Sequence, residues 1–233
     1  MNLLAIVLIL VAAAFAAHYY QRLERERRTA LEYLAAELGL RFDGSRDPSY
    51  HRRYAHGLFR RGRKRLAENT LHGTLSLGGR SCAVRMGDYR YTTGSGKNQR
   101  THRLSYLVLH VPWVGTPDLL IRRERIGDKI GSGIGFDDID FESEEFSRRF
   151  WVKASDRKHA YDVVHAGMMR FLLDGPQPHV EIVDDACLVL DGRDRWSPEE
   201  FRGWLAWAGA FFDLWPEHLT ERYRERADVR GIL

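Results

Sequence analysis

An apolar run near the start of the chain constrains its fold more than any other feature. From Leu3 to Ala17 no side chain is charged or strongly polar. A helix rises about 1.5 Å per residue, so roughly twenty residues span a hydrocarbon core about 30 Å thick. The rest of the sequence is charged and soluble in character. The sequence therefore predicts a transmembrane anchor over residues 1–20, through which the chain would contact a lipid bilayer.

The apolar run has two alternative interpretations. Ala14-Phe15-Ala16 has the small-x-small form that signal peptidase accepts, which would suit a cleaved secretory signal, and a helix buried in a soluble core is the other alternative. A signal peptide has a positive n-region, whereas only Met1 and Asn2 precede this run. The positive charges follow it, at Arg22, Arg25, Arg27 and Arg28. By the positive-inside rule this favours a retained, single-pass anchor with the soluble domain in the cytoplasm.

The remaining length and composition suit a globular domain. About 210 residues follow the anchor, enough for one sizeable domain or two small ones. Charged residues make up 29% of the chain and hydrophobic residues 44%, which is not the composition of a disordered protein. Cys82 and Cys187 lie far apart without CxxC spacing, so we expect buried free thiols and neither a zinc site nor a disulfide framework. No motif indicates a cofactor.

Residues 21–39 are predicted to form a juxtamembrane helix that continues from the anchor. Its apolar stripe at positions i, i+3, i+4 and i+7 consists of Leu31, Leu34, Ala35 and Leu38. Gly39 is expected to be the left-handed residue that ends this helix. We expect the soluble domain to occupy residues 40–233.

The period of the apolar residues changes to two after Asn69. Thr70–Leu77 alternates as a half-buried strand does, and Gly78-Gly79 has the form of a two-residue hairpin turn. Consecutive strands with short turns predict an antiparallel β-meander, and hence an α+β domain. The further strands predicted are a return strand through Tyr91, Leu104–Val111 and Asp118–Ile126.

Two amphipathic helices are predicted to cover one face of this sheet. The first begins with a cap at Ser155 or Asp156 and ends at Gly175-Pro176. The second begins at Ser197, whose sequence context is that of a capping box, and runs to about Trp215. Each has a single broad apolar stripe that it must bury. Between them lies a second predicted hairpin, formed by Val180–Val183 and Cys187–Leu190.

A basic region lies between Arg46 and Arg65, with Asp47 as its only acid and aromatic side chains interleaved. Basic residues with aromatics can hold nucleic acid through phosphate contacts and base stacking. Next to a membrane anchor the anionic inner leaflet is the nearer polyanion, worth roughly 1 kcal/mol per basic residue. We expect contact with an anionic surface, either lipid headgroups or an acidic protein. Nucleic acid is disfavoured, and a solvated loop without a partner is the alternative. The predicted contact residues are Arg60, Arg61, Arg63, Lys64 and Arg65.

Three other patterns indicate no site. Gly127–Gly135 lacks both the GK[ST] ending of a P-loop and the GxGxxG spacing, so it is predicted to be a plain connection. The acidic residues from Asp137 to Glu145 have no EF-hand spacing and suit the start of a helix, where the macrodipole favours negative charge. His159 and His165 are six positions apart, do not share a helix face, and are expected at the surface or its rim.

Two segments carry a resemblance. Residues 138–175 read DIDFESEEFSRRFWVKASDRKHAYDVVHAGMMRFLLDG, and residues 58–73 read LFRRGRKRLAENTLHG. In these segments the chain resembles a group of bacterial proteins of unknown function, several of which have one N-terminal membrane segment before a domain of this size. The resemblance implies a bacterial inner-membrane location and a single α+β soluble domain. It implies no activity, cofactor or catalytic residue.

The sequence contains no catalytic signature of the GxSxG, HExxH, CxxC or Walker type. Two hypotheses from different classes follow. The first is a membrane-tethered, cytoplasmic, non-catalytic interaction or scaffold module that holds a partner at the inner leaflet. The second is a hydrolase or nuclease that acts on an anionic substrate, with acids from Asp137 to Glu145 beside the basic region. They differ in where the fold places those acids.

Overall fold

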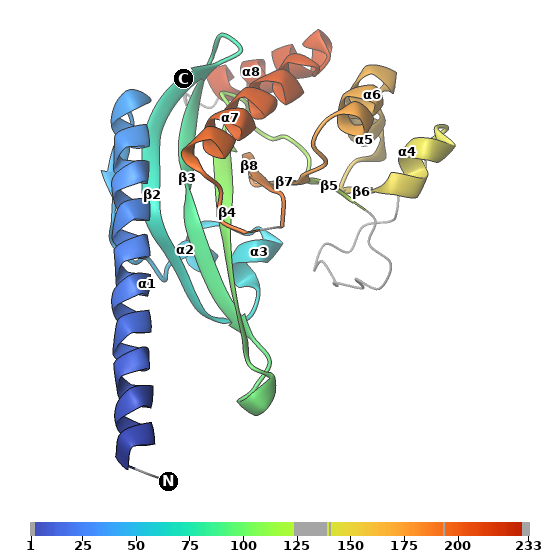
Figure 1. The fold of residues 1–233 in the computed structure, drawn as a ribbon. Helices are drawn as coiled ribbons and strands as arrows, with labels where there is room; N and C mark the ends of the chain where they lie inside the picture. The colour runs from blue at the N-terminus through green and yellow to red at the C-terminus, as the bar shows by residue number, and fades with distance from the viewer. Residues whose placement is uncertain (1–2, 124–138, 140, 193, 230–233) are drawn as a thin grey trace.

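The computed structural model describes residues 3–123, 139, 141–192 and 194–229 (Figure 1). One eight-stranded sheet forms its centre, every neighbouring pair is antiparallel, and helices pack on both faces, which confirms the α+β class.

The strands are β1 (Arg41–Asp43), β2 (Arg63–Leu77), β3 (Arg80–Thr93), β4 (Arg100–His110), β5 (Leu119–Arg123), β6 (Phe150–Ala154), β7 (His179–Val183) and β8 (Ala186–Leu190). The helices are α1 (Leu3–Glu37), α2 (Tyr50–Arg53), α3 (Gly57–Arg60), η1 (Gly96–Asn98), α4 (Glu144–Arg149), α5 (Arg157–Val163), α6 (Ala166–Asp174), α7 (Pro198–Asp213) and α8 (Glu217–Val229).

Helix α1 is continuous from the apolar run into the soluble part of the chain. It extends from Leu3 to Glu37 without interruption, so the predicted anchor and the predicted juxtamembrane helix form one rod. By length and composition α1 is able to cross a membrane, and none of its most apolar 18-residue window is buried against the rest of the chain. Its C-terminal half packs along β1 and β2, and its N-terminal half projects past the body of the domain, where the end of the β3–β4 hairpin also extends (Figure 1).

The stripe on the second half of α1 belongs to the hydrophobic core. Leu31, Leu34 and Ala35 are buried there, and Leu38 packs at its margin. Gly39 has a φ of 67°, the left-handed conformation predicted for it, and the chain then turns into β1. The helical spacing predicted this docking because a single face of α1 meets the sheet.

The sheet begins as the predicted meander and then departs from it. Strands β2, β3 and β4 are consecutive neighbours, and the turn residues Gly78 and Gly79 have φ values of 56° and 73°, as a type I′ turn requires. The predicted fourth strand, β5, does not pair with β4. The hairpin β7–β8 lies between them, in the order β1-β2-β3-β4-β8-β7-β5-β6. All five residues of β8 are buried. The strand therefore lies between two other strands, and side chains pack on both faces of the sheet around it.

Apolar side chains form two clusters, one on each face of the sheet. The larger combines α1, α5, α6 and α7 with the strands and includes Met86, Leu107 and Phe211. The smaller lies under α2 and α3 on the opposite face and is rich in tyrosine, with Tyr50 and Tyr89 among its members. The two long predicted helices do cover one face. The other face is covered by helices of four residues each, which are too short to show a helical period in the sequence.

The helix predicted from Asp156 to Gly175 is divided in two. Helix α5 ends at Val163, and His165 is the N-cap residue of α6. Its Nδ1 accepts a hydrogen bond from the Gly167 N–H at 3.1 Å, and its Nε2 lies 2.9 Å from the Leu214 carbonyl oxygen. The apolar stripe runs through both helices, so its spacing did not reveal the break.

The expectation that His159 lies at the surface or rim is wrong. Its side chain is 2% exposed, and its Nδ1 lies 2.9 Å from the hydroxyl oxygen of Tyr223 on α8. Trp215 packs edge-on against the imidazole, with ring centroids 5.5 Å apart. These partners come from the C-terminal part of the chain, so helix-face reasoning within residues 157–174 could not place them.

The unfolding free energy is expected to fall as the pH is lowered, because His159 is buried in its neutral form. Burial lowers the pKa of His159 to about 4, whereas an unfolded histidine titrates near 6.5. Between these values the unfolded chain binds more protons, so stability is complete above roughly pH 6.5 and is lost as the pH falls towards 4. The contribution of His159 should decrease by about 2 kcal/mol between pH 7.5 and pH 5. Denaturant titrations of the detergent-solubilised chain measure this, and His159→Gln should flatten the profile. An unchanged slope in that variant would contradict the assignment.

Three smaller predictions are confirmed. The Ser197 hydroxyl accepts from the Glu200 N–H at 3.2 Å, and the Glu200 carboxylate accepts from the Ser197 N–H at 2.7 Å, which completes the capping box of α7. The second hairpin forms between β7 and β8. Cys82 and Cys187 are buried and free, and burial raises the pKa of both thiols.

Candidate functional site: a basic groove

The predicted contact residues lie where α3 leads into β2. Arg60 is the last residue of α3, and β2 begins at Arg63. The strand therefore starts before Asn69, where the alternation of the sequence placed it. Four of the five side chains are exposed and that of Arg65 is half-buried. The structure thus brings Arg60, Arg61, Arg63, Lys64 and Arg65 together at one end of the sheet.

Two β-bulges explain why the sequence pattern missed the beginning of β2. The register with β3 shifts between Arg63 and Leu66, where Lys64 has a φ of 51°. It shifts again after Glu68, where Asn69 has a φ of 50°. A bulge inserts one residue, breaks the alternation and re-aims the neighbouring side chains. Regular alternation therefore begins only after the second bulge.

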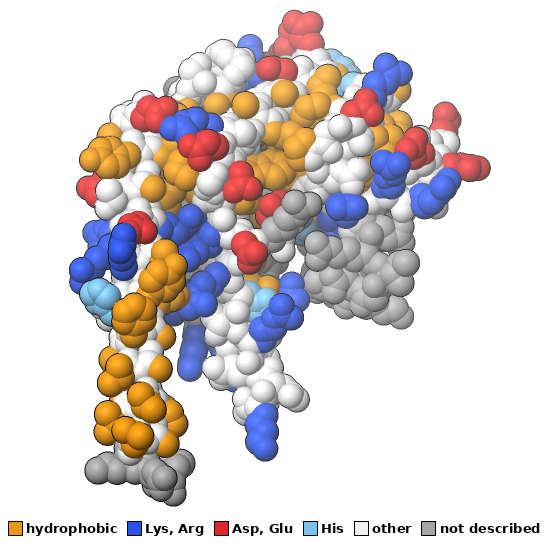
Figure 2. Space-filling view, in the orientation of Figure 1, with side chains coloured by type: hydrophobic (Ala, Val, Ile, Leu, Met, Phe, Trp, Pro, Cys, Tyr) orange, Lys and Arg blue, Asp and Glu red, His pale blue; other side chains and the backbone are white. Residues whose placement is uncertain are grey.

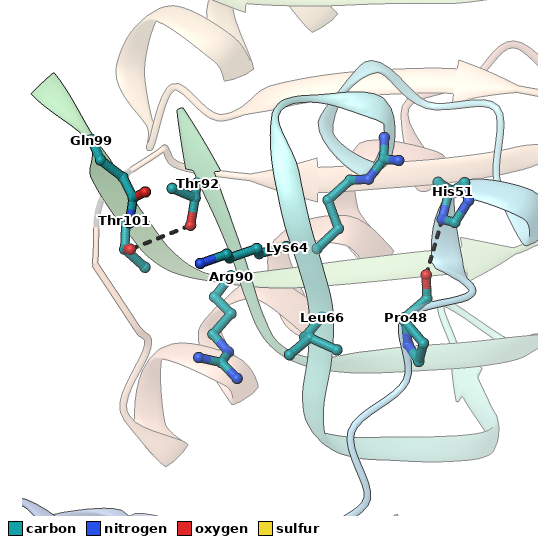
Figure 3. A pocket seen from close by; sticks show the side chains of 9 residues that line it. Pro48, His51, Lys64, Leu66, Arg90, Thr92, Gln99 and Thr101 are labelled. Carbon is teal, nitrogen blue, oxygen red and sulfur yellow. Dashed lines mark hydrogen bonds between the residues drawn. The ribbon is translucent and has the colours of Figure 1, made fainter. Parts of the chain in front are cut away.

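A groove of about 660 Å³ opens beside the first bulge (Figure 3). The side chains of Lys64 and Arg90 lie on the same side of β2 as Thr92 and Thr101, whose hydroxyl oxygens are 3.3 Å apart. Positive charge in the lining thus lies next to hydroxyl groups that can donate hydrogen bonds. The lining residues with polar or charged side chains that suit an anion are Lys64, Arg65, Arg90, Thr92, Gln99 and Thr101.

The positive charge of the predicted contact residues is not neutralised by the described carboxylates. None of the five forms an ion pair within the parts of the chain that the structure covers. Glu68, on the same strand, is engaged by Arg46 at 3.0 Å and by Arg90 at 2.9 Å. Arg65 donates to the carbonyl oxygen of Arg60 at 2.9 Å, a bond that holds the side chain without cancelling its charge.

The charge of nearby arginines affects the pKa of two aromatic residues beside the groove, Tyr91 and His102. The Arg61 guanidinium lies 5.6 Å from the centre of the Tyr91 ring, which stacks on His102 at 4.7 Å. Burial and the guanidinium groups of Arg100 and Arg61 lower the pKa of His102. Burial raises the pKa of Tyr91, and the same two arginines oppose that rise. The potential at this end of the sheet is therefore positive.

The groove is level with the end of the predicted anchor. Leu66 pairs with Arg90, and Arg90 pairs with Arg103, so these residues form one row across β2, β3 and β4. The Arg103 guanidinium lies 5.7 Å from the centre of the ring of Tyr20 on α1. Figure 2 shows Lys and Arg side chains gathered where the exposed apolar part of α1 meets the domain. The basic groove therefore lies near the level at which the apolar segment leaves the body of the domain.

Helix α1 is fixed to the sheet by an ion pair between the half-buried Arg27 and the buried Asp88. Arg27 donates twice to Asp88, at 2.7 Å and 2.5 Å, and also to the carbonyl oxygen of Trp196 at 3.0 Å. Asp88 is 4% exposed. It also accepts from the Ser105 hydroxyl at 3.0 Å and from the Asn69 amide at 3.1 Å. Bidentate pairs of this kind restrict the relative orientation of the two side chains and also contribute interaction energy.

Two further ion pairs extend this connection along α1. Arg195 donates to Glu24 at 2.9 Å, and Arg202 of α7 pairs with Glu37 at the other end of the docked half. Burial acts to raise the pKa of Glu24, but the hydrogen bond and charge of Arg195 outweigh it, so the net shift is downward. With the apolar contacts of Leu31 and Leu34, these pairs set the direction of α1 relative to the groove.

The hydrolase or nuclease hypothesis requires acids from Asp137 to Glu145 beside the basic region. Those of these acids that the structure describes do not lie there. Glu144 and Glu145 are exposed in the first turn of α4, which packs on β6. Strand β6 is six sheet positions from β2, roughly 29 Å at about 4.8 Å per strand. Asp137, Asp138, Asp140 and the segment Gly127–Gly135 lie outside the described residues. Among the described residues, no three His, Cys, Asp or Glu side chains gather as a metal site would require.

The sequence did not single out the groove residues on β3 and β4, nor the pair that fixes α1. A signal for both existed in β3, where Asp88, Arg90 and Thr92 alternate with Tyr89 and Tyr91. This alternation places three polar side chains on the face that otherwise carries Met86 and Val84. Which of them would be buried depends on α1, and no local pattern encodes that contact.

Comparison with known proteins gives one structural likeness. No protein-family model and no curated protein match the chain, which agrees with the resemblance to bacterial proteins of unknown function. Among solved structures, the crystal structure of the mycobacterial trehalose monomycolate transport factor A, TtfA, is similar with a TM-score of 0.52 and 11% sequence identity. The match covers 82% of this chain and 97% of that chain. The likeness is one of fold.

Proposed function

We propose that the chain is a membrane-tethered, non-catalytic interaction module whose basic groove holds the domain against anionic lipid headgroups. The observation that supports this best is the position of the groove. It is level with Tyr20, at the end of the sheet towards which the apolar part of α1 projects. In this proposal residues 3–20 cross a bacterial inner membrane, and the basic flank from Arg22 to Arg28 keeps the domain in the cytoplasm.

The groove offers the groups that a headgroup phosphate needs. Lys64 and Arg65 bring positive charge, and the exposed hydroxyl of Thr101, which lies 3.3 Å from that of Thr92, can donate a hydrogen bond to a phosphate oxygen. The exposed Arg61 adds charge within reach of the same surface. Each basic residue close to an anionic leaflet contributes roughly 1 kcal/mol, and the attraction decays over about 8 Å at physiological salt. A domain fixed to the anchor helix stays inside that range.

The description of the similar solved structure is compatible with a non-catalytic role. Its description is that of a trehalose monomycolate transport factor, and a transport factor for such a molecule need not catalyse a reaction. At 11% identity the likeness transfers no cargo to this chain. The described acids of α4 lie at the far edge of the sheet from the groove, which further favours binding over hydrolysis.

Charge reversal should remove the attraction to anionic vesicles. A fragment of residues 21–233 keeps Leu31, Leu34 and Arg27 and is mixed with vesicles with and without anionic lipid. Sedimentation is expected to show binding that depends on anionic lipid and weakens with salt. The variant Arg60→Glu, Arg61→Glu, Arg63→Glu should bind at least tenfold more weakly, since the expected contribution is roughly 1 kcal/mol per basic residue.

A matched variant separates position from net charge. Arg148→Glu, Lys158→Glu, Arg170→Glu changes the same number of exposed charges on α4, α5 and α6, and should bind nearly as the unchanged fragment does. Circular dichroism and thermal melts verify that all three proteins are folded. Equal loss in both variants, or equal binding to neutral and anionic vesicles, would remove the proposal. Preferential binding to nucleic acid, without any lipid preference, would replace it with another partner.

A further inference from the structure

The β3–β4 hairpin continues past the groove, alongside the apolar part of α1. Two contacts align the hairpin with the helix: Arg27 donates to Ser105, and Arg103 lies over the Tyr20 ring. The direction along β4 from Ser105 to Arg103 is therefore the same as the direction along α1 from Arg27 to Tyr20. Continued past Tyr20, this direction follows α1 into its apolar run. Figure 1 shows the hairpin extending beside the N-terminal half of α1.

The hairpin extends well beyond the level of Tyr20. Strand β4 continues from Arg103 to its first residue, Arg100, roughly 10 Å at about 3.3 Å per residue. The tip, residues 93–99, lies farther still and contains the single turn η1. Gly94 has a φ of 69°, and a Cβ there would overlap the Asn98 carbonyl oxygen, so the tip is tightly turned.

The tip is polar and basic, unlike the helix beside it. Residues 94–101 are all exposed, and the sequence TGSGKNQRTHR (residues 93–103) contains Lys97, Arg100 and Arg103 but no acid. Figure 2 shows a hairpin whose lower part is largely uncharged, with blue basic atoms at its end, and a gap between it and the apolar part of α1. Placing Lys or Arg at the centre of a bilayer costs roughly 2.5–3.5 kcal/mol each. Hydrocarbon is therefore not the environment of this tip.

We infer that the tip of the β3–β4 hairpin is a second contact of the chain with the membrane and lies in the headgroup layer of the leaflet that α1 enters. The partner is lipid phosphate and glycerol, which can accept hydrogen bonds from Lys97, Arg100 and the exposed backbone N–H groups of the tip. This inference rests on the part of the proposed function in which α1 crosses the bilayer. It follows from the geometry of α1 and β4, so it does not depend on whether the groove prefers anionic lipid.

This second contact determines how α1 lies in the bilayer. A helix perpendicular to the membrane would carry the tip below the headgroups, because the tip extends past Tyr20. The tip lies to one side of α1, so a tilt of the helix towards the opposite side moves the tip back to the headgroup layer. Transmembrane helices tilt by about 20° on average and by up to about 40°. We expect a tilt in the upper part of this range, where the tip and the basic groove reach the headgroup layer together.

Depth-dependent quenching in the full chain tests the inference. A fluorescent probe is attached at Ser95→Cys, in the exposed tip, and the protein is reconstituted in neutral phosphatidylcholine vesicles. Cys82 and Cys187 are 1% and 2% exposed, so the unchanged protein serves as a labelling blank. Lipids with a nitroxide on the headgroup should quench the probe at least threefold more than lipids with a mid-chain nitroxide. A probe at Ser81→Cys, exposed at the opposite end of the sheet, should be quenched by neither.

Each result decides for or against the inference. Headgroup quenching at position 95 in neutral vesicles supports it, even if the groove shows no preference for anionic lipid. An unquenched probe at position 95 overturns it, because the tip would then stand in water or be covered by protein. Stronger quenching by the mid-chain nitroxide overturns it as well, because the tip would lie in hydrocarbon. Loss of anionic preference in the groove variants, with quenching at position 95 retained, affects the proposed function alone.

Discussion

Replacing Asp88 by alanine is expected to destabilise the domain by about 3–5 kcal/mol, the cost of leaving a buried charge without its partner. The substitution removes both hydrogen bonds from Arg27 and also the acceptor used by Ser105 and Asn69. Arg27, whose side chain is 15% exposed, then keeps the Trp196 carbonyl and the Ser105 hydroxyl. Urea titrations of the detergent-solubilised chain, followed by tryptophan fluorescence, measure the change.

Two companion variants make the Asp88 result specific. Glu26→Ala breaks the exposed pair with Arg22 on the same helix and should change stability by less than about 0.5 kcal/mol. Combining Arg27→Met with Asp88→Leu removes both charges, and it should restore most of the loss because no unpaired charge remains. Hydrogen exchange of residues 21–30 should increase in Asp88→Ala alone. Equal stability of Asp88→Ala and Glu26→Ala would show that α1 is not held by this pair.

Phe211→Ala is also expected to cost about 3–5 kcal/mol, through lost burial and the cavity that remains. Phe211 is fully buried in α7, where its ring stacks on Trp207 at 5.3 Å and meets Phe212 at 5.2 Å. Trp204 lies two turns nearer the start of the helix and is only half-buried. Trp204→Ala should therefore cost roughly half as much, since the contribution scales with the area removed from water.

The control for α7 is a substitution on its exposed face. Ala210→Ser changes helix propensity by about 0.5 kcal/mol and touches no core side chain. Thermal melts and denaturant titrations of the same detergent-solubilised preparations rank the three variants. A near-unchanged melting temperature for Phe211→Ala would indicate that this face of α7 contacts a membrane or a partner instead of the core.

The elements with local signals were predictable from the sequence. The stripe of Leu31, Leu34 and Ala35 follows from helical spacing alone, and the Gly78-Gly79 turn and the Ser197 capping box depend on residues a few positions apart. Each is determined within one turn or one hairpin. Local chemistry fixes such features whatever the rest of the chain does.

The features that required long-range contacts were not predictable in the same way. The insertion of β7–β8 between β4 and β5 is a pairing between strands far apart in the sequence, and no local pattern specifies which strand lies beside β4. The bulge at Lys64 is invisible to a period-two pattern because it interrupts the pattern itself. The basic region was predicted by its charge, whereas its partners Arg90 and Thr101 became visible only when three strands were aligned.

The continuity of α1 has a mechanical consequence. No loop or glycine interrupts the helix between its apolar segment and the residues that bind Asp88 and Arg195. A domain on a flexible linker samples all orientations, whereas this one turns as a unit with the rod to which it is fixed. If α1 crosses a bilayer, the domain keeps two rotations relative to the membrane: spin about the helix axis and the tilt of that axis. Any change of surroundings that alters the tilt of α1, such as a thinner bilayer, would therefore change the angle between the groove and the membrane.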